Sequence, residues 1–253
     1  MTLTASTVVL MVGAIVVGAT LQRVSGTGMG LVVAPLLAVI LGAGTGVLVA
    51  NATTTVSALL LTIAVRRSVE WRRAALIGAL ALPGAVLGAV VVGSVPPGAL
   101  QVLVGAIVLG ALALSSLVSW LGRLPHLRRW WVTPLAGLLG GAFNATAGVA
   151  APVMVVHAGL VRWSQHGFAA TMQPVFMTMG ASSVLAKTVI TPVVPWVPPW
   201  WVAGLVILGV LAGIALGSAL AGKVAPATAR RTAVTLAALG GASAVVRGLL
   251  VPG

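Results

Sequence analysis

The chain has 253 residues, 60% hydrophobic and 6% charged, and its 14 lysines and arginines face a single acid, Glu70, for a formal net charge of +13. Soluble domains carry roughly a quarter charged residues, so this composition excludes one and predicts an all-α, polytopic membrane protein. The absence of cysteine excludes disulfides and thiolate chemistry, and three histidines with one carboxylate argue against an enzyme, a metal site or a bound cofactor.

The basic residues predict the topology. Ten of the 14 lie in three short clusters between long apolar stretches, where cytoplasmic loops are expected. Connections at residues 94–98 and 191–199 are proline-rich and uncharged, as expected on the far side. Nucleic-acid binding would need a basic face on a soluble domain and is not expected. The clusters are Arg66, Arg67, Arg72 and Arg73; Arg123, Arg128 and Arg129; and Lys223, Arg230 and Arg231.

Apolar stretches long enough to cross a bilayer need about 20 residues. They occur at 47–65, 74–93, 99–119, 167–190, 200–221 and 232–250. Two further apolar regions, 4–42 and 132–158, contain glycine and polar interruptions and do not fit single spans. The first could form one full span with a half helix, two full spans, or a re-entrant hairpin. It lacks a small-residue cleavage site, so we expect it to be retained and not removed as a signal peptide.

An internal repeat predicts the overall plan. Trp71 and five later residues recur, with the same identities, 129 positions further along the chain. The second copies are Trp200, Gly213, Gly217, Gly222, Val224 and Pro226. The flanking charges are reversed between the copies, as expected for inverted-topology repeats of transporters. We therefore expect a first repeat at 1–120, a basic cytoplasmic linker at 121–131 and a second repeat at 132–253. Each repeat would hold a broken, re-entrant hairpin and three spanning helices; the alternative is eight full spans in two parallel halves.

Two glycine-containing breaks predict a ligand site. A half helix that starts after such a break directs the positive end of its dipole into the membrane, so two inverted breaks would favour a small anion near the midplane. The alternative is a glycine-rich packing seam. The candidate groups at the breaks are Gly26, Gly28 and Gly30 in the first half and Asn144, Thr146 and Gly148 in the second.

Other polar groups near these breaks are candidates for the same site. Arg23, beside Gln22, has no acid nearby in sequence, so a bound anion could be its counter-charge. The alternative is that Arg23 caps a complete first helix at the cytoplasmic interface. Asn51 and Gln173 occupy similar places in the two halves and either line the site or join helices. Lys187 is expected to extend to the outer interface.

The residues at these positions resemble a known family, the sulfite exporter TauE/SafE family. The similarity lies in Gly26-Thr-Gly-Met-Gly-Leu-Val-Val-Ala-Pro35, in Val69-Glu-Trp-Arg72 and in Gly148-Val-Ala-Ala-Pro152. The family usually has glycine at the positions of Ala150 and Ala151 and aspartate at that of Glu70. The resemblance implies export or exchange of sulfite, organosulfonates or similar anions across the bacterial inner membrane.

The expected function is therefore a multi-pass inner-membrane transporter of small sulfur-containing anions, which we expect to export them by alternating access. Its partners would be the anion and the lipid bilayer, and a homodimer is left open. Cation transport and carboxylate-linked proton coupling are disfavoured because no acid lies within a span. A non-transport membrane scaffold or assembly protein is the alternative; it predicts no stabilisation by anions.

Overall fold

The computed structural model describes residues 4–25, 29–122, 124–127, 129–190 and 200–250. Within these ranges the chain is helical throughout its regular structure, which confirms the all-α membrane fold. One short 3₁₀ turn, Arg66–Ser68, follows α3. The α-helices are α1 Ala5–Ser25, α2 Gly30–Leu41, α3 Ala43–Val65, α4 Trp71–Ser94, α5 Pro97–Leu121, α6 Val132–Ala147, α7 Ala151–Leu160, α8 Gln165–Val189, α9 Trp200–Leu220 and α10 Pro226–Leu250.

The predicted spans each coincide with one long helix, from α3 to α5 and from α8 to α10. Six helices of the described part are long and apolar enough to cross a membrane: α1, α3, α4, α5, α9 and α10. α8 has 25 residues, but its sequence is more polar because it carries buried serine, threonine, glutamine and lysine side chains. The predicted loop at 191–199 lies outside the described residues.

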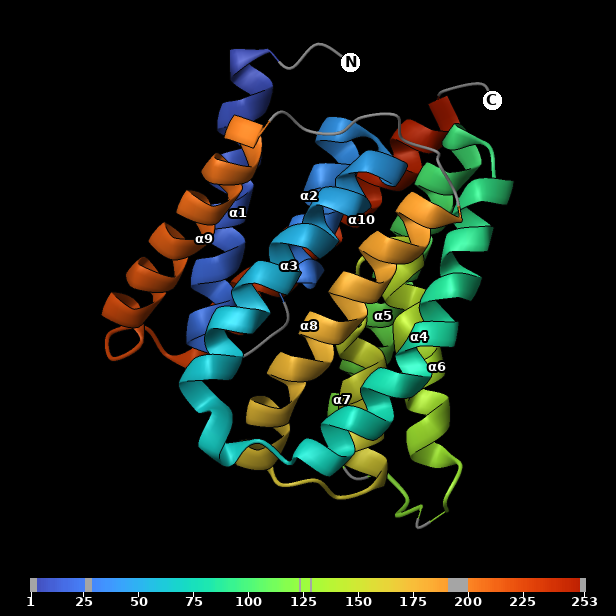
Figure 1. Cartoon of the computed structure of the whole chain (residues 1–253), viewed down its shortest axis with the longest axis vertical. Helices are drawn as coiled ribbons and strands as arrows, with labels where there is room; N and C mark the ends of the chain where they lie inside the picture. The colour runs from blue at the N-terminus through green and yellow to red at the C-terminus, as the bar shows by residue number, and fades with distance from the viewer. Residues whose placement is uncertain (1–3, 26–28, 123, 128, 191–199, 251–253) are drawn as a thin grey trace.

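The two interrupted regions form helical hairpins. α1 is a full-length helix of 21 residues, whereas α2 has 12 and is too short to cross a bilayer. α6 and α7 have 16 and 10 residues. In Figure 1, α1 and α2 enter and return at the end of the bundle that holds both termini, and α6 and α7 do so at the opposite end. Eight full spans are therefore excluded, and the arrangement is compatible with inverted repeats.

Helices of the first half pack against helices of the second half in reciprocal pairs. α4 packs on α6 of the second half, and α9 packs on α1 of the first; α3 packs on α8, and α5 on α10. The repeated glycines lie at these reciprocal contacts. A methyl group on Gly84 or Gly88 would overlap backbone carbonyls of α6, and one on Gly213 or Gly217 would overlap those of α1. Small residues allow backbones to approach this closely, which helps helices associate in lipid.

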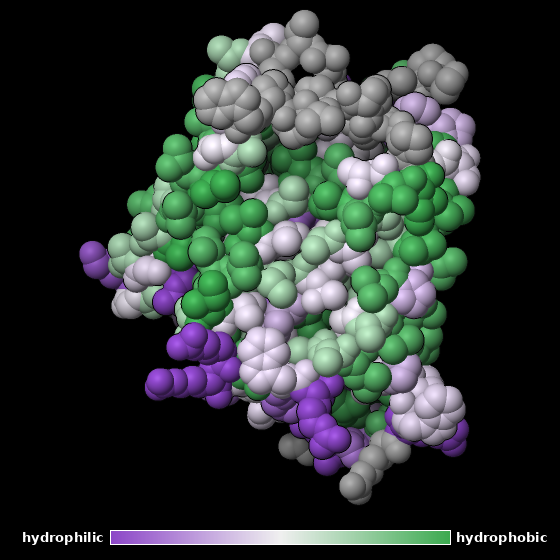
Figure 2. Space-filling view, in the orientation of Figure 1, coloured by the Kyte–Doolittle hydropathy of each residue, from purple (hydrophilic) through white to green (hydrophobic). Residues whose placement is uncertain are grey.

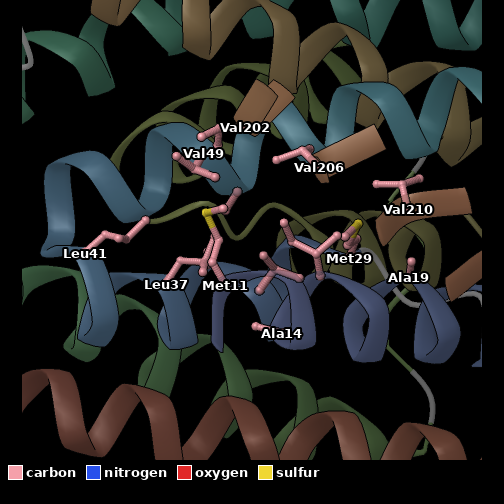
Figure 3. Packing of buried hydrophobic residues seen from close by; sticks show 14 residues of the cluster. Met11, Ala14, Ala19, Met29, Leu37, Leu41, Val49, Val202, Val206 and Val210 are labelled. Atoms are coloured by element: carbon pink, nitrogen blue, oxygen red, sulfur yellow. The ribbon is translucent and has the colours of Figure 1, made fainter. Parts of the chain in front are cut away.

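Most of the interior is apolar, and the basic residues of the α3–α4 and α9–α10 connections lie at one end, whereas Lys187 and Arg247 lie near the other. Met11, Leu37, Val49 and Val206, among others, fill the space between α1, α2, α3 and α9 (Figure 3). In the view of Figure 2, hydrophilic residues collect at the lower end, which is the end of the α3–α4 and α9–α10 connections, below a broad hydrophobic surface. This distribution fits a bilayer around the middle of the bundle with the basic loops on one side.

Candidate functional site

The two helix breaks meet in the interior of the bundle. Gly148 ends α6 in the left-handed region, with φ of 72°, and its N–H donates to the carbonyl of Asn144 over 2.8 Å. Gly30 begins α2, and a methyl group added to it would overlap the carbonyl oxygen of Gly148. Two segments far apart in sequence are therefore in backbone contact at this point. Gly26 and Gly28, which we predicted to contribute to the first break, lie outside the described residues.

A first cluster of amides joins α3, α6 and α8. Asn51 Nδ2 donates to the Asn144 carbonyl over 3.1 Å and to Ser183 Oγ over 2.6 Å. Asn144 Nδ2 donates in return to Asn51 Oδ1 over 3.1 Å. All three side chains are buried. Because Asn144 also accepts the Gly148 N–H, this cluster is tied directly to the second helix break.

A second cluster joins α1, α8 and α3. Gln22 Nε2 donates to Gln173 Oε1 over 3.3 Å, and Ser57 Oγ donates to Gln22 Oε1 over 2.6 Å. These side chains are also buried. The cluster lies in the last turn of α1, next to the first helix break.

The two clusters join equivalent pairs of helices, with the two halves in opposite roles. Asn51 of α3 bonds Asn144 of α6, and Gln173 of α8 bonds Gln22 of α1. The same number of residues separates Gln22 from Asn144 and Asn51 from Gln173. Each pair adds a serine from the remaining helix of the α3–α8 contact. The sequence similarity of the halves thus has a counterpart in the hydrogen bonds.

A cavity of about 480 Å³ leads from the basic end of the bundle toward the breaks. Arg162, Gln165 and Arg230 line its outer part, and Ala151, the first residue of α7, lines its inner part. The lining of α8 extends from Gln165 to Phe176, which is about 16 Å along the helix. The cavity therefore has two arginines at its mouth, and at its inner end the N-terminus of α7 lies among apolar side chains such as Met172 and Phe176. A helix N-terminus presents backbone N–H groups and a positive dipole end.

Three other polar side chains discussed in the sequence analysis make no hydrogen bond to either cluster. Arg23 is exposed in the last turn of α1, and its Nε donates to Ser218 Oγ of α9 over 3.0 Å. Thr146 is buried but its Oγ1 bonds the carbonyl of Ala142 in its own helix. Lys187 was expected to extend to the outer interface, and this is wrong: its side chain is buried, with 6% exposed.

The predicted site residues did not include Ser57, Ser183 or Thr54. The two serines complete the amide clusters, and Thr54 Oγ1 is buried without a hydrogen-bond partner among the described residues. Gly30 faces Thr54, since a methyl group there would stand 3.8 Å from its Oγ1. Serine and threonine are common in membrane helices and usually bond their own backbone, so no local signal distinguished these three from their neighbours.

The fold is that of a multi-pass helical membrane protein in which two broken hairpins meet in the interior. The sequence model of the family described as Sulfite exporter TauE/SafE matches residues 10–244. The chain therefore belongs to the sulfite exporter TauE/SafE family, a family of membrane transporters. No curated protein and no solved structure matches it significantly.

Proposed function

We propose that the chain exports small sulfur-containing anions, such as sulfite or organosulfonates, across the bacterial inner membrane. The observation that carries the proposal is the contact between the two helix breaks, flanked by two equivalent amide clusters. Discontinuous helices at the interface of inverted repeats form substrate sites in transporters. Family membership supports a sulfur-containing anion as the substrate.

The proposed binding groups are neutral N–H donors at the breaks. Oxyanions accept hydrogen bonds from helix N-termini and side-chain amides. The start of α7 at Ala151 lines the cavity that opens toward the basic loops, so an anion from the cytoplasm would reach it first. Asn51, Asn144, Gln22 and Gln173 would then exchange their bonds to one another for bonds to the anion.

The cations at the basic end would concentrate anions before binding. Arg162 and Arg230 line the cavity, and Arg23 lies exposed in the turn of α1 that ends at Ser25, another cavity residue. A cleft lined by one sign of charge raises the local concentration of the opposite ion. We assign Arg23 to this entrance because its guanidinium bonds α9 and not the amide clusters.

The mechanism proposed is alternating access between the two repeats. The cavity lined by Arg162 and Arg230 opens toward the basic end, which we take as cytoplasmic. The contacts of α4 with α6 and of α9 with α1 would be the surfaces that slide past each other. Glycine at these contacts brings the backbones of the paired helices together without side chains that interlock between them.

The test is anion-dependent stabilisation of the purified protein and uptake into proteoliposomes. Sulfite, thiosulfate, sulfoacetate and taurine would be compared for the wild type, Asn144→Ala and a control, Thr53→Ala, whose hydroxyl bonds only its own helix. We expect at least one anion to raise the melting temperature of the wild type and the control, with a much smaller shift in Asn144→Ala. If none of the four stabilises or is transported by the wild type, a scaffold role replaces transport.

A further inference from the structure

Lys187 of α8 carries a buried amine that has no hydrogen-bond partner among the described residues. Its side chain is 6% exposed, and no described atom makes a hydrogen bond to its Nζ. A charged side chain within the membrane is costly, and such residues almost always pair with a group or face a ligand pathway. In its charged form Lys187 would therefore need a counter-charge, which the described residues do not supply.

The sequence has one acidic residue, Glu70, which precedes α4 and lies beside the first turns of α8, at the opposite end of that helix from Lys187. Glu70 accepts a hydrogen bond from Trp163 Nε1 over 2.6 Å and pairs with Arg73 over 3.1 Å. Its backbone N–H donates to Thr171 Oγ1 in the first turns of α8. Thr171 is 16 residues before Lys187, which is about 24 Å along the helix. Glu70 cannot neutralise Lys187, so no side chain of this protein can.

Lys187 lies one helical turn beyond the first amide cluster. Along the face of α8 that meets α3, a methyl on Gly180 would contact Asn51 and Thr55, and Ser183 bonds Asn51. Residues four apart share a helix face, so Lys187 continues this line by about 6 Å, away from the basic loops. The adjacent Ala186 packs in a buried cluster with Ala145, the neighbour of Asn144.

We propose that Lys187 binds the transported anion on the outer half of its path. This inference rests on the proposed function and adds the residue that supplies a full positive charge beyond the neutral amides. The path would then have arginines at its inner mouth, amides in the middle and one ammonium group near its outer end. The ammonium would form charge-assisted hydrogen bonds with the anion oxygens, which selects against neutral solutes of the same size.

The test exploits the presence of only two lysines in the chain, Lys187 and Lys223. Full-length wild type, Lys187→Gln, Lys187→Arg and Lys223→Gln would be reconstituted, and uptake of radiolabelled sulfite measured against its concentration. Lys223→Gln removes the same charge from an exposed loop residue. We expect Lys187→Gln to raise the half-saturating sulfite concentration by about tenfold, Lys187→Arg to restore most of the affinity, and Lys223→Gln to match the wild type.

A second variant keeps the inference testable if Lys187→Gln does not fold. Lys187→Met removes the unpaired charge, so it should raise the melting temperature without anion and lose the further rise that sulfite gives the wild type. The inference is overturned if Lys187→Gln keeps a half-saturating concentration within twofold of the wild type, or if Lys187→Met still responds to sulfite. Absence of sulfite, thiosulfate, sulfoacetate and taurine transport by the wild type would instead refute the proposed function.

Discussion

Replacing Asn51 by alanine tests the first amide cluster most directly. The change removes two donated hydrogen bonds, to the Asn144 carbonyl and Ser183 Oγ, and one accepted from Asn144 Nδ2. Interhelical hydrogen bonds in membrane proteins contribute about 0.6 kcal/mol each on average, with an upper value near 1.7. Three bonds, together with the donor left unpaired on Asn144, give an expected loss of about 2–3 kcal/mol in the free energy of unfolding.

The assay is reversible unfolding in mixed detergent micelles, followed by far-ultraviolet circular dichroism. Thr53→Ala is the matched control, because Thr53 is equally buried in α3 but its Oγ1 bonds the carbonyl of Val49 in the same helix. We expect this control to lose less than about 1 kcal/mol. A double-mutant cycle of Asn51→Ala with Asn144→Ala should give a coupling energy of about 1 kcal/mol or more, because the two side chains bond each other.

Two results would refute this reasoning. If Asn51→Ala destabilises the protein no more than Thr53→Ala, the buried amides do not hold the three helices together. If the double-mutant cycle shows coupling below about 0.3 kcal/mol, within the additivity of independent sites, Asn51 and Asn144 act separately and the cluster is not a unit.

Three other substitutions have defined expectations. Gly148→Ala should destabilise by about 2 kcal/mol or more, because φ of 72° disfavours a side chain and the methyl would overlap Ala34; Gly110→Ala, where the space is open, should be neutral or stabilising by circular dichroism. Glu70→Gln keeps an acceptor for the Trp163 indole and should cost less than about 1 kcal/mol, less than Glu70→Ala, because the ion pair is half exposed; equal losses would contradict this. Arg23→Gln should raise the half-saturating sulfite concentration at low salt and match the wild type at high salt; a salt-independent defect would place Arg23 at the site itself.

Much of the fold followed from local properties of the sequence. Runs of apolar residues predicted each long helix, and glycines with polar neighbours predicted the interruptions between α1 and α2 and between α6 and α7. The reversed charges around the repeated glycines predicted the opposite entry of the two hairpins, which Figure 1 is compatible with. The lengths of the helices on either side of the breaks could not be predicted. The sequence of residues 4–42 was compatible with several arrangements, and the structure shows that α1 is a full helix of 21 residues.

The candidate site was predictable in part. Asn51 and Gln173 were found because an amide in a membrane helix has to find a partner, and Gln22 and Asn144 because they flank the two helix breaks. Which amide meets which was not predictable, since the partners are far apart in the chain and every helix is apolar around most of its surface. Without a polar face, the sequence gives little information on how a helix is rotated about its axis. Lys187 was misplaced because it lies in the last turn of α8, where a lysine was expected to extend to the interface.

The sequence alone determined the membrane environment, the sides of the loops and the positions of the breaks, because hydropathy, lysine and arginine placement and glycine act within a single segment. Only the tertiary structure decided that the breaks touch through Gly30 and Gly148 and that the serines complete the two clusters. These outcomes depend on close packing between helices of opposite halves, where backbone contacts at small residues set the rotation and depth of each helix.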